Sequence, residues 1–173
     1  MKPAAFDYAR PASIPEALAM LAGRPEAKVL AGGQTLGPML NLRLAQPALL
    51  VDITRIPELA AVSEDADAVT IGATVTHAAI EDGRVPDPTG GFLAKVARGI
   101  AYRAVRTRGT IGGSLAHADP AADWVGALPL RPRESGVGRD RGISRLEGPE
   151  RPLVGLDRQP VVGLGPGPLH LLV

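Results

Sequence analysis

Two short segments combine a glycine pair with polar neighbours: Ala31-Gly32-Gly33-Gln34-Thr35 and, much later in the chain, Thr110-Ile111-Gly112-Gly113-Ser114. A glycine pair lets several backbone N–H groups approach an anion with no Cβ in the way, and a following helix adds its positive N-terminal end. This is the chemistry needed to hold a pyrophosphate. A glycine pair can equally form a tight turn that needs positive φ and holds no ligand. Because two pairs with the same flanking chemistry are hard to explain as unrelated turns, we expect an anion site.

Neither segment has the spacing of the common nucleotide-binding motifs. Both lack the G-x-G-x-x-G pattern of dinucleotide-binding folds, and neither ends in Gly-Lys-Ser or Gly-Lys-Thr. The segments therefore indicate a nucleotide fold of another kind.

Polar side chains flank the second glycine segment. His117 and Asp123 follow it and have the chemistry to contact a phosphate or a polar group of a ligand. The alternatives are a histidine satisfied inside the protein and a carboxylate that the dipole of a first helical turn favours. The same ambiguity applies to His77, where Thr76 would cap the following helix, whereas Trp124 is expected in the core.

Three arginines, Arg103, Arg106 and Arg108, precede the second glycine segment. They have the charge to neutralise a diphosphate or to contact a partner subunit. A solvated helix end explains them as well, because cations are favoured at helix C-termini, and this is the interpretation that we favour.

The elements that must position these residues alternate between strands and helices, which indicates an α/β class. Ser13, Pro15 and Glu16 form the pattern of a capping box at a helix start. The first unit is expected to contain strands near 6–8, 27–30 and 49–53 and helices near 14–22 and 38–44. The second is expected to contain strands near 60–63 and 68–73, helices near 76–81 and 91–104, and a helix with Asp119 as N-cap and Pro120 as first residue.

The composition is that of a globular protein, with 45% hydrophobic and 21% charged residues. The net charge of +1 gives no basic field for nucleic acid. The absence of cysteine excludes iron–sulfur clusters and disulfides, and the three histidines form no ligand cluster. No signal peptide or membrane span is recognisable, so a cytoplasmic location is expected.

After Leu130 the character of the sequence changes, because arginine, glycine and proline accumulate and no regular period remains. Three parts are therefore expected: a first subdomain over 1–57, a truncated second subdomain over 58–130, and a tail over 131–173. The tail is expected to be disordered or to have been read out of frame.

The two glycine segments and their surroundings resemble the FAD-binding medium subunit of the xanthine dehydrogenase and aerobic carbon monoxide dehydrogenase family of molybdenum hydroxylases. That family has an A-G-G-Q-S-L loop and a T-I-G-G-S/N loop. Residues 30–36 match the first loop with Thr35 in place of serine, and residues 108–123 match the surroundings of the second without a break. The resemblance covers about residues 1–130. One departure is Thr107, where the family commonly has asparagine.

The resemblance implies a fold, a cofactor and partners. The fold is the two-subdomain α/β (α+β) FAD-binding fold of the vanillyl-alcohol-oxidase and p-cresol-methylhydroxylase type, expected to be incomplete at the C-terminus. FAD would pass electrons from a small iron–sulfur subunit, and originally from a large molybdopterin subunit, to a final acceptor. No catalytic acid, base or nucleophile and no metal ligand is expected on this chain. The expected cofactor-binding residues are Leu30, Ala31, Gly32, Gly33, Gln34, Thr35, Leu36, Thr110, Ile111, Gly112, Gly113, Ser114, His117 and Asp123.

Two other functions remain open at this point. One is a truncated, non-catalytic interaction module of the same fold that has lost the cofactor. The other is a stand-alone flavin oxidase, which is disfavoured because no base or covalent flavin attachment residue stands at a convincing position.

Overall fold

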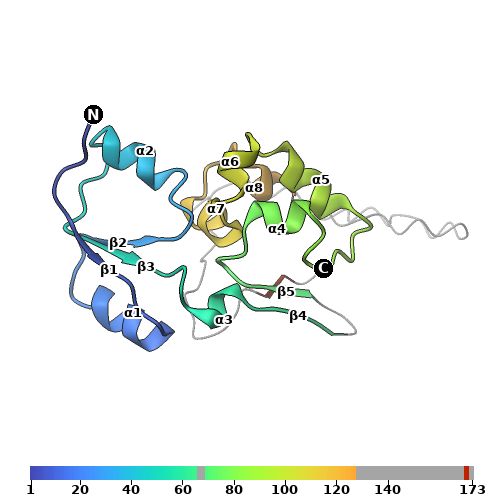
Figure 1. Cartoon of the computed structure of the whole chain (residues 1–173), viewed down its shortest axis with the longest axis horizontal. Helices are drawn as coiled ribbons and strands as arrows, with labels where there is room; N and C mark the ends of the chain where they lie inside the picture. Colours follow the sequence, from blue (N-terminus) through green and yellow to red (C-terminus); the bar gives the residue numbers. More distant parts are fainter. Residues whose placement is uncertain (66–68, 128–169, 172–173) are drawn as a thin grey trace, which may run out of the picture.

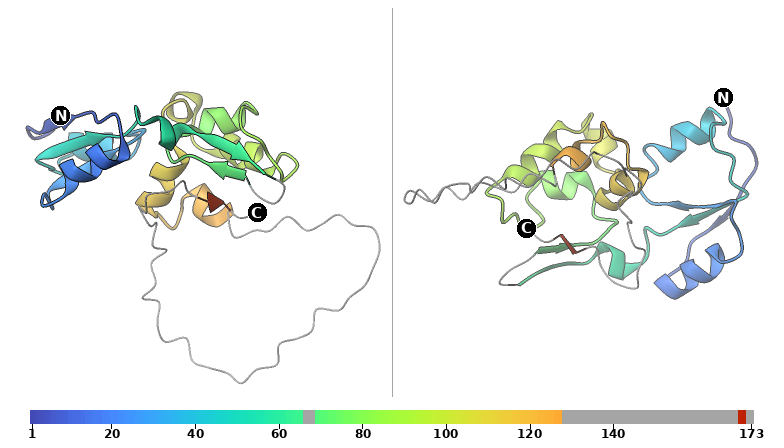
Figure 2. Two further views of the ribbon diagram at one scale, coloured as in Figure 1. Left: turned by 90° about the horizontal axis from the view of Figure 1, so that it is seen from below. Right: turned by 180° about the vertical axis from the view of Figure 1, so that it is seen from behind.

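The computed structural model describes residues 1–65, 69–127 and 170–171. These residues form two lobes that lie side by side, the first blue to cyan and the second green to orange (Figures 1 and 2). The first lobe is an α/β layer structure, and the second packs several helices on a small antiparallel sheet.

The first lobe is built on a parallel sheet of three strands in the order β1-β3-β2. The strands are β1 (Asp7–Ala9), β2 (Ala27–Leu30) and β3 (Leu49–Asp52). The central strand β3 is buried along its whole length, as expected of a short apolar run covered on both faces. Helix α1 (Ile14–Leu21) covers one face and α2 (Leu36–Asn41) the other (Figure 1).

Helix α1 begins as its sequence predicts. Ser13 accepts a hydrogen bond from the backbone N–H of Glu16 at 3.4 Å, and the Glu16 carboxylate accepts one from the N–H of Ala12 at 2.8 Å. These bonds satisfy donors that a helix start leaves free. The helix buries Ala17 against Leu49 and Val51 of the central strand.

The carboxyl edge of the sheet is closed by a polar cluster on Asp52. Its carboxylate accepts hydrogen bonds from the Tyr8 hydroxyl and from the backbone N–H and hydroxyl of Thr54, and it forms an ion pair with Arg10 at 3.3 Å. Burial opposes ionisation of Asp52, but the bonds from Thr54 and Tyr8 outweigh it and hold the pKa of this carboxyl below its usual value. Asp52 pairs in register with Leu30, so the cluster lies beside the start of the first glycine segment.

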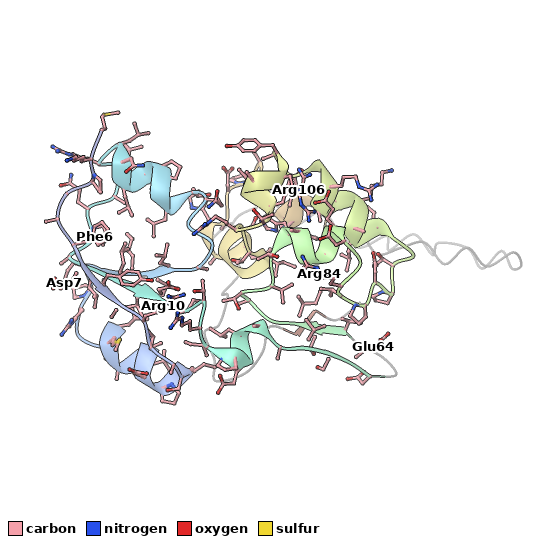
Figure 3. All side chains as sticks on the ribbon, in the orientation of Figure 1. Phe6, Asp7, Arg10, Glu64, Arg84 and Arg106 are labelled. Carbon is pink, nitrogen blue, oxygen red and sulfur yellow. The ribbon has the colours of Figure 1, made fainter. Side chains whose placement is uncertain are left out.

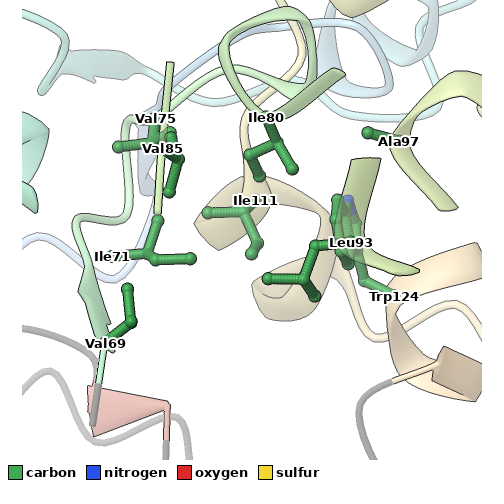
Figure 4. Close-up of a cluster of buried hydrophobic side chains, with 9 residues drawn as sticks. All are labelled: Val69, Ile71, Val75, Ile80, Val85, Leu93, Ala97, Ile111 and Trp124. Carbon is green, nitrogen blue, oxygen red and sulfur yellow. The ribbon is translucent and has the colours of Figure 1, made fainter. Parts of the chain in front are cut away.

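The second lobe has its own core. Helix α3 (Pro57–Ala60) leads into the antiparallel strands β4 (Val62–Glu64) and β5 (Val69–Ile71), and the backbone of β6 (His170–Leu171) pairs with β5. Within the described residues, β5 is followed by the helices α4 (His77–Glu81), α5 (Phe92–Gly99), α6 (Arg103–Arg106), α7 (Ile111–His117) and α8 (Asp123–Ala127). Side chains from β5 and from all of these helices except α6, among them Ile71, Leu93, Ile111 and Trp124, form one buried cluster (Figure 4).

Some element boundaries differ from those predicted. Helix α2 occupies Leu36–Asn41 rather than 38–44. The expected helix over 91–104 is divided into α5 and α6, because the backbone turns at Ala101 with a φ of 41°. Asp119 caps only a turn, by accepting from the N–H of Ala121 at 2.9 Å, and the helix itself begins at Asp123.

The expected tail over 131–173 lies outside the described residues, apart from the two-residue strand β6. None of the helices in the described part of the chain is both long and apolar enough to cross a membrane.

Candidate functional site

The first glycine segment presents a row of free backbone donors. The N–H groups of residues 32–35 make no hydrogen bond within the part of the chain that the structure describes. The Gln34 side-chain amide donates to the Gly32 carbonyl at 2.9 Å, and the Gly33 carbonyl accepts from the Gly37 N–H at 2.8 Å, so the carbonyls are engaged within the loop. Successive free N–H groups at the start of a helix favour an anion.

Only one glycine of the two pairs needs its conformational freedom. Gly33 has a φ of 69°, which side chains rarely adopt, whereas Gly32, Gly112 and Gly113 do not have positive φ. The alternative of a simple tight turn therefore accounts for Gly33 alone.

The other three glycines lie so close to neighbouring atoms that a side chain there would clash or press against them. A Cβ on Gly32 would lie 2.1 Å from the Arg108 carbonyl oxygen, and one on Gly112 would lie 2.5 Å from the Ala73 Cβ. A Cβ on Gly113 would lie 2.8 Å from the Thr110 hydroxyl oxygen and 3.8 Å from the Ala31 Cβ. The two glycine segments, one from each lobe, therefore lie against each other, and Figure 1 shows the start of α7 beside the loop that leaves β2.

The second glycine segment is the first turn of a helix and not an open loop. Thr110 is the N-cap of α7, and its hydroxyl accepts from the Gly113 N–H at 3.1 Å. The N–H groups of Ile111 and Gly112 donate to the Val75 and Ala73 carbonyls, both at 3.0 Å. These two donors are thus used inside the protein, in contrast to the row of free N–H groups that the first glycine segment presents in the described part of the chain. The Ser114 hydroxyl makes no hydrogen bond within the described residues.

The other predicted site residues lie farther along the same lobe. His117 is exposed in the last turn of α7, and Asp123 is exposed at the first position of α8. Leu30 and Leu36 flank the first glycine segment and pack against the core residues Leu40 and Leu50.

The arginine cluster is engaged by carboxylates. Arg106 is largely buried and pairs with Glu81 at 2.8 Å, and Arg103 reaches both Glu81 and Asp82 at 2.7 Å. Figure 3 shows Arg106 between α6 and α4, where it also donates to the carbonyls of Ile100 and Ala101. These arginines therefore fasten α6 to α4, contrary to the solvated helix end that we favoured from sequence. Arg108 is exposed and forms no ion pair in the described part of the chain.

His77 is a buried residue whose partners the sequence left unassigned. Its Nδ1 accepts a hydrogen bond from the Trp124 indole N–H at 3.1 Å, and both rings are buried, as expected for Trp124. Burial lowers the pKa of His77 to about 4, with Arg106 lowering it further and Asp123 opposing the change. The ring is therefore neutral near pH 7, with its proton on Nε2. Thr76 caps α4 by accepting from the Ala79 N–H at 3.2 Å, as predicted.

One buried hydroxyl has no hydrogen-bond partner among the residues that the structure describes. The Oγ1 atom of Thr74 is inaccessible to solvent and makes no hydrogen bond. Thr74 lies in the segment that bonds to the start of α7, immediately after Ala73, which contacts Gly112. Thr74 was not predicted as a site residue, and neither was Gly109, where a Cβ would lie 2.8 Å from Cδ2 of the His77 ring. No group of three or more side chains suited to a metal ion occurs among the described residues.

The fold and the row of free N–H groups define an α/β domain suited to an anionic cofactor, and comparison with known proteins gives its family. Residues 4–130 match the model of the FAD binding domain in molybdopterin dehydrogenase. The chain therefore belongs to this family of FAD-binding domains, and FAD is the cofactor of the family. The expected family and fold class are both confirmed.

Individual relatives agree with this assignment. The chain is 46% identical over 124 residues to the alpha subunit of the 6-hydroxypseudooxynicotine dehydrogenase complex of Paenarthrobacter nicotinovorans, covering 71% of this chain and 42% of the relative. It is 44% identical over 124 residues to the carbon monoxide dehydrogenase medium chain of Hydrogenophaga pseudoflava, covering 71% and 43%. The chain thus spans less than half the length of these relatives.

Solved structures show the same fold. The structure superimposes on carbon monoxide dehydrogenase from Hydrogenophaga pseudoflava with a TM-score of 0.66 at 43% identity, covering 72% of this chain and 44% of that one. For quinoline 2-oxidoreductase from Pseudomonas putida 86 the TM-score is 0.63 at 46% identity, covering 69% and 42%.

Proposed function

We propose that this chain binds FAD with the diphosphate at the first glycine segment, as the flavin-carrying part of a molybdenum-containing hydroxylase. The observation that carries the proposal is the row of free N–H groups at residues 32–35, which matches the acceptor oxygens of a diphosphate. Leu30, Ala31 and Leu36 shape this cradle.

The second glycine segment has a different part in the proposal. Because the N–H groups of residues 111–114 are bonded within the protein, this segment would contribute two other features to the site. One is its close-packed surface against Ala31, and the other is the Ser114 hydroxyl, which makes no hydrogen bond within the described residues. The exposed side chains of His117 and Asp123 would contact polar groups of FAD from the same lobe.

Bound FAD supplies the chemistry of accepting and releasing electrons, and this chain supplies its position. The role that we propose is transfer of electrons from iron–sulfur clusters on a small partner subunit to a final acceptor. Molybdopterin would lie on a large partner subunit. The relatives named as subunits or medium chains of dehydrogenase complexes support this division of labour. We also propose a cytoplasmic location and a boundary between the two subdomains at residues 57 and 58.

A pair of matched variants tests the cradle. Gly33 and Gly23 both have positive φ, of 69° and 70°, but only Gly33 lies in the row of free N–H groups. Replacing either glycine with alanine strains the backbone by a similar amount, and the Cβ on residue 33 also meets Leu30 Cδ1 at 3.2 Å, the movable end of a side chain. We expect Gly33→Ala to weaken FAD binding by about tenfold or more, which corresponds to about 1.4 kcal/mol, and Gly23→Ala to leave it unchanged.

FAD affinity is measured by quenching of flavin fluorescence during titration of the full-length chain. A wild-type chain that is folded and takes up no FAD would refute the proposed function. Equal losses for Gly33→Ala and Gly23→Ala would show that the first glycine segment is not the diphosphate site.

A further inference from the structure

His77 connects three elements of the second lobe. Its backbone N–H donates to the Gly109 carbonyl at 2.9 Å, directly before the N-cap of α7. Its ring lies so close to Gly109 that a Cβ there would be 2.8 Å from Cδ2 and 2.9 Å from Nε2. Its Nδ1 accepts from the Trp124 indole on α8, and the two ring centroids are 6.0 Å apart.

These contacts lie on both sides of the proposed FAD contacts in this lobe. Gly109 immediately precedes Thr110, whose carbonyl and hydroxyl hold the first turn of α7. Trp124 immediately follows Asp123, the first residue of α8. A shift of the His77 ring would therefore move the start of α7 and the start of α8 together.

The His77 and Trp124 pair also has a chemical requirement that an apolar side chain cannot meet. Trp124 is completely buried, so its indole N–H must find an acceptor inside the protein, and Nδ1 of His77 is that acceptor. Purely apolar packing at this position would leave the N–H unpaired.

We propose that His77 is a positioning residue for FAD: its ring and backbone fix the entrance of α7, and its bond to Trp124 fixes the first turn of α8. It acts through the residues that it holds and does not touch the cofactor. The inference rests on the proposed function, because it assigns His77 a part in arranging that site.

Three variants of the full-length chain separate this role from simple core packing. His77→Asn places an amide oxygen near the position of Nδ1 and can still accept from Trp124. His77→Leu keeps bulk but removes the acceptor, and Trp124→Phe removes the donor of the same bond. Ser13→Ala, which removes the side-chain cap of α1 on the face of the first-lobe sheet opposite α2, serves as a control that lowers stability alone.

Two measurements are made on each variant: the dissociation constant for FAD, and the visible absorption spectrum of the bound flavin, which reports the surroundings of its ring. We expect His77→Leu and Trp124→Phe to weaken FAD binding about tenfold and to alter the spectrum. His77→Asn is expected to restore both nearly to wild type, and Ser13→Ala to change neither.

Several results would overturn the inference. One is a folded His77→Leu chain with wild-type affinity and spectrum, and another is failure of His77→Asn to restore them. An equal loss of FAD affinity in Ser13→Ala would assign the effect to stability. If His77→Leu does not fold, Trp124→Phe reports on the same bond. Two further outcomes separate this inference from the proposed function. If the wild-type chain binds FAD, and Gly33→Ala weakens binding while the His77 and Trp124 variants do not, the positioning role alone is refuted. If the wild-type chain does not bind FAD, the proposed function and this inference are refuted together.

Discussion

Gly32 is the residue at which the first glycine segment contacts the other lobe. A Cβ there would lie 2.1 Å from the Arg108 carbonyl oxygen and 2.7 Å from the Gly109 Cα, and neither backbone atom can move without displacing the start of α7. Gly37, a few residues later in α2, has open space around it. The two glycines therefore have opposite sensitivities to an added methyl group.

We expect Gly32→Ala to lower the free energy of unfolding by about 1–3 kcal/mol, because it forces the lobes apart. Gly37→Ala is expected to raise it by about 0.5–1 kcal/mol, because alanine is the better helix former. Urea denaturation of the chain without FAD measures both. A neutral Gly32→Ala would show that the lobes are not in contact in solution.

Thr74 and Thr110 provide a second contrast between neighbouring hydroxyls. The Thr74 hydroxyl is buried without a partner, whereas that of Thr110 accepts a hydrogen bond as the N-cap of α7. Thr74→Val replaces an unpaired polar group with a methyl of the same shape, which is neutral or stabilising. Thr110→Val removes the cap and is expected to cost about 0.5–2 kcal/mol.

The measurement is the free energy of unfolding of both valine variants without FAD. A loss above about 1 kcal/mol for Thr74→Val without FAD would mean that its hydroxyl has a protein or water partner in solution.

At the scale of elements, the pairing of α4 with α8 makes stability depend on pH. The pKa of His77 falls from 6.5 to about 4 on folding, so the unfolded chain binds this proton more readily than the folded chain. The contribution of His77 to the free energy of unfolding is therefore fully present above pH 6.5, and it is lost as the pH falls toward 4, by roughly 3 kcal/mol in total. The carboxyls of Asp52, Glu81 and Asp82 have lowered pKa values, so their contributions are lost in a lower window, below about pH 4.5.

Denaturation between about pH 7 and about pH 4.5 isolates the contribution of His77. The wild-type chain is expected to lose stability across this range, and His77→Asn, which cannot titrate, is expected to lose much less. A pH dependence that persists unchanged in His77→Asn would assign the effect to other groups.

Elements whose signals are local were predictable from sequence, and those that depend on distant contacts were not. The capping pattern at Ser13 predicts the start of α1, and the apolar run before Gly32 predicts β2, and the structure contains both elements. The N-terminal turn of α7 was missed because its N–H groups bond to the distant segment 73–75. The break at Ala101 was missed because it depends on a positive φ at an alanine. The pairing of His77 with Trp124 joins residues far apart in the chain, which sequence spacing does not reveal.

At the scale of the whole molecule, two lobes with separate cores meet at the glycine segments. Leu49, Val51 and Ile56 belong to a core of the first lobe, and Ile71 and Trp124 to that of the second. Figures 1 and 2 show the lobes as distinct bodies. They are linked by the chain itself, which passes through α3, and by the contact of Gly32 with Arg108. A cofactor that reaches from the first segment to residues of α7 would add a further link between them.

This arrangement predicts a difference between FAD and FMN, which shares the flavin ring and lacks the diphosphate bridge and adenosine. At a FAD concentration about 100 times its dissociation constant, binding stabilises the folded chain by about 2.7 kcal/mol. FMN at the same concentration is expected to stabilise it far less, because the free N–H groups of residues 32–35 would lack the diphosphate that they are suited to bind. Thermal unfolding with each flavin measures how much more FAD stabilises the chain than FMN does. Gly33→Ala should make the two stabilisations more similar, because it reduces the effect of FAD and leaves that of FMN unchanged. Equal stabilisation by FAD and FMN would mean that the flavin ring, and not the cradle in the first lobe, provides the affinity.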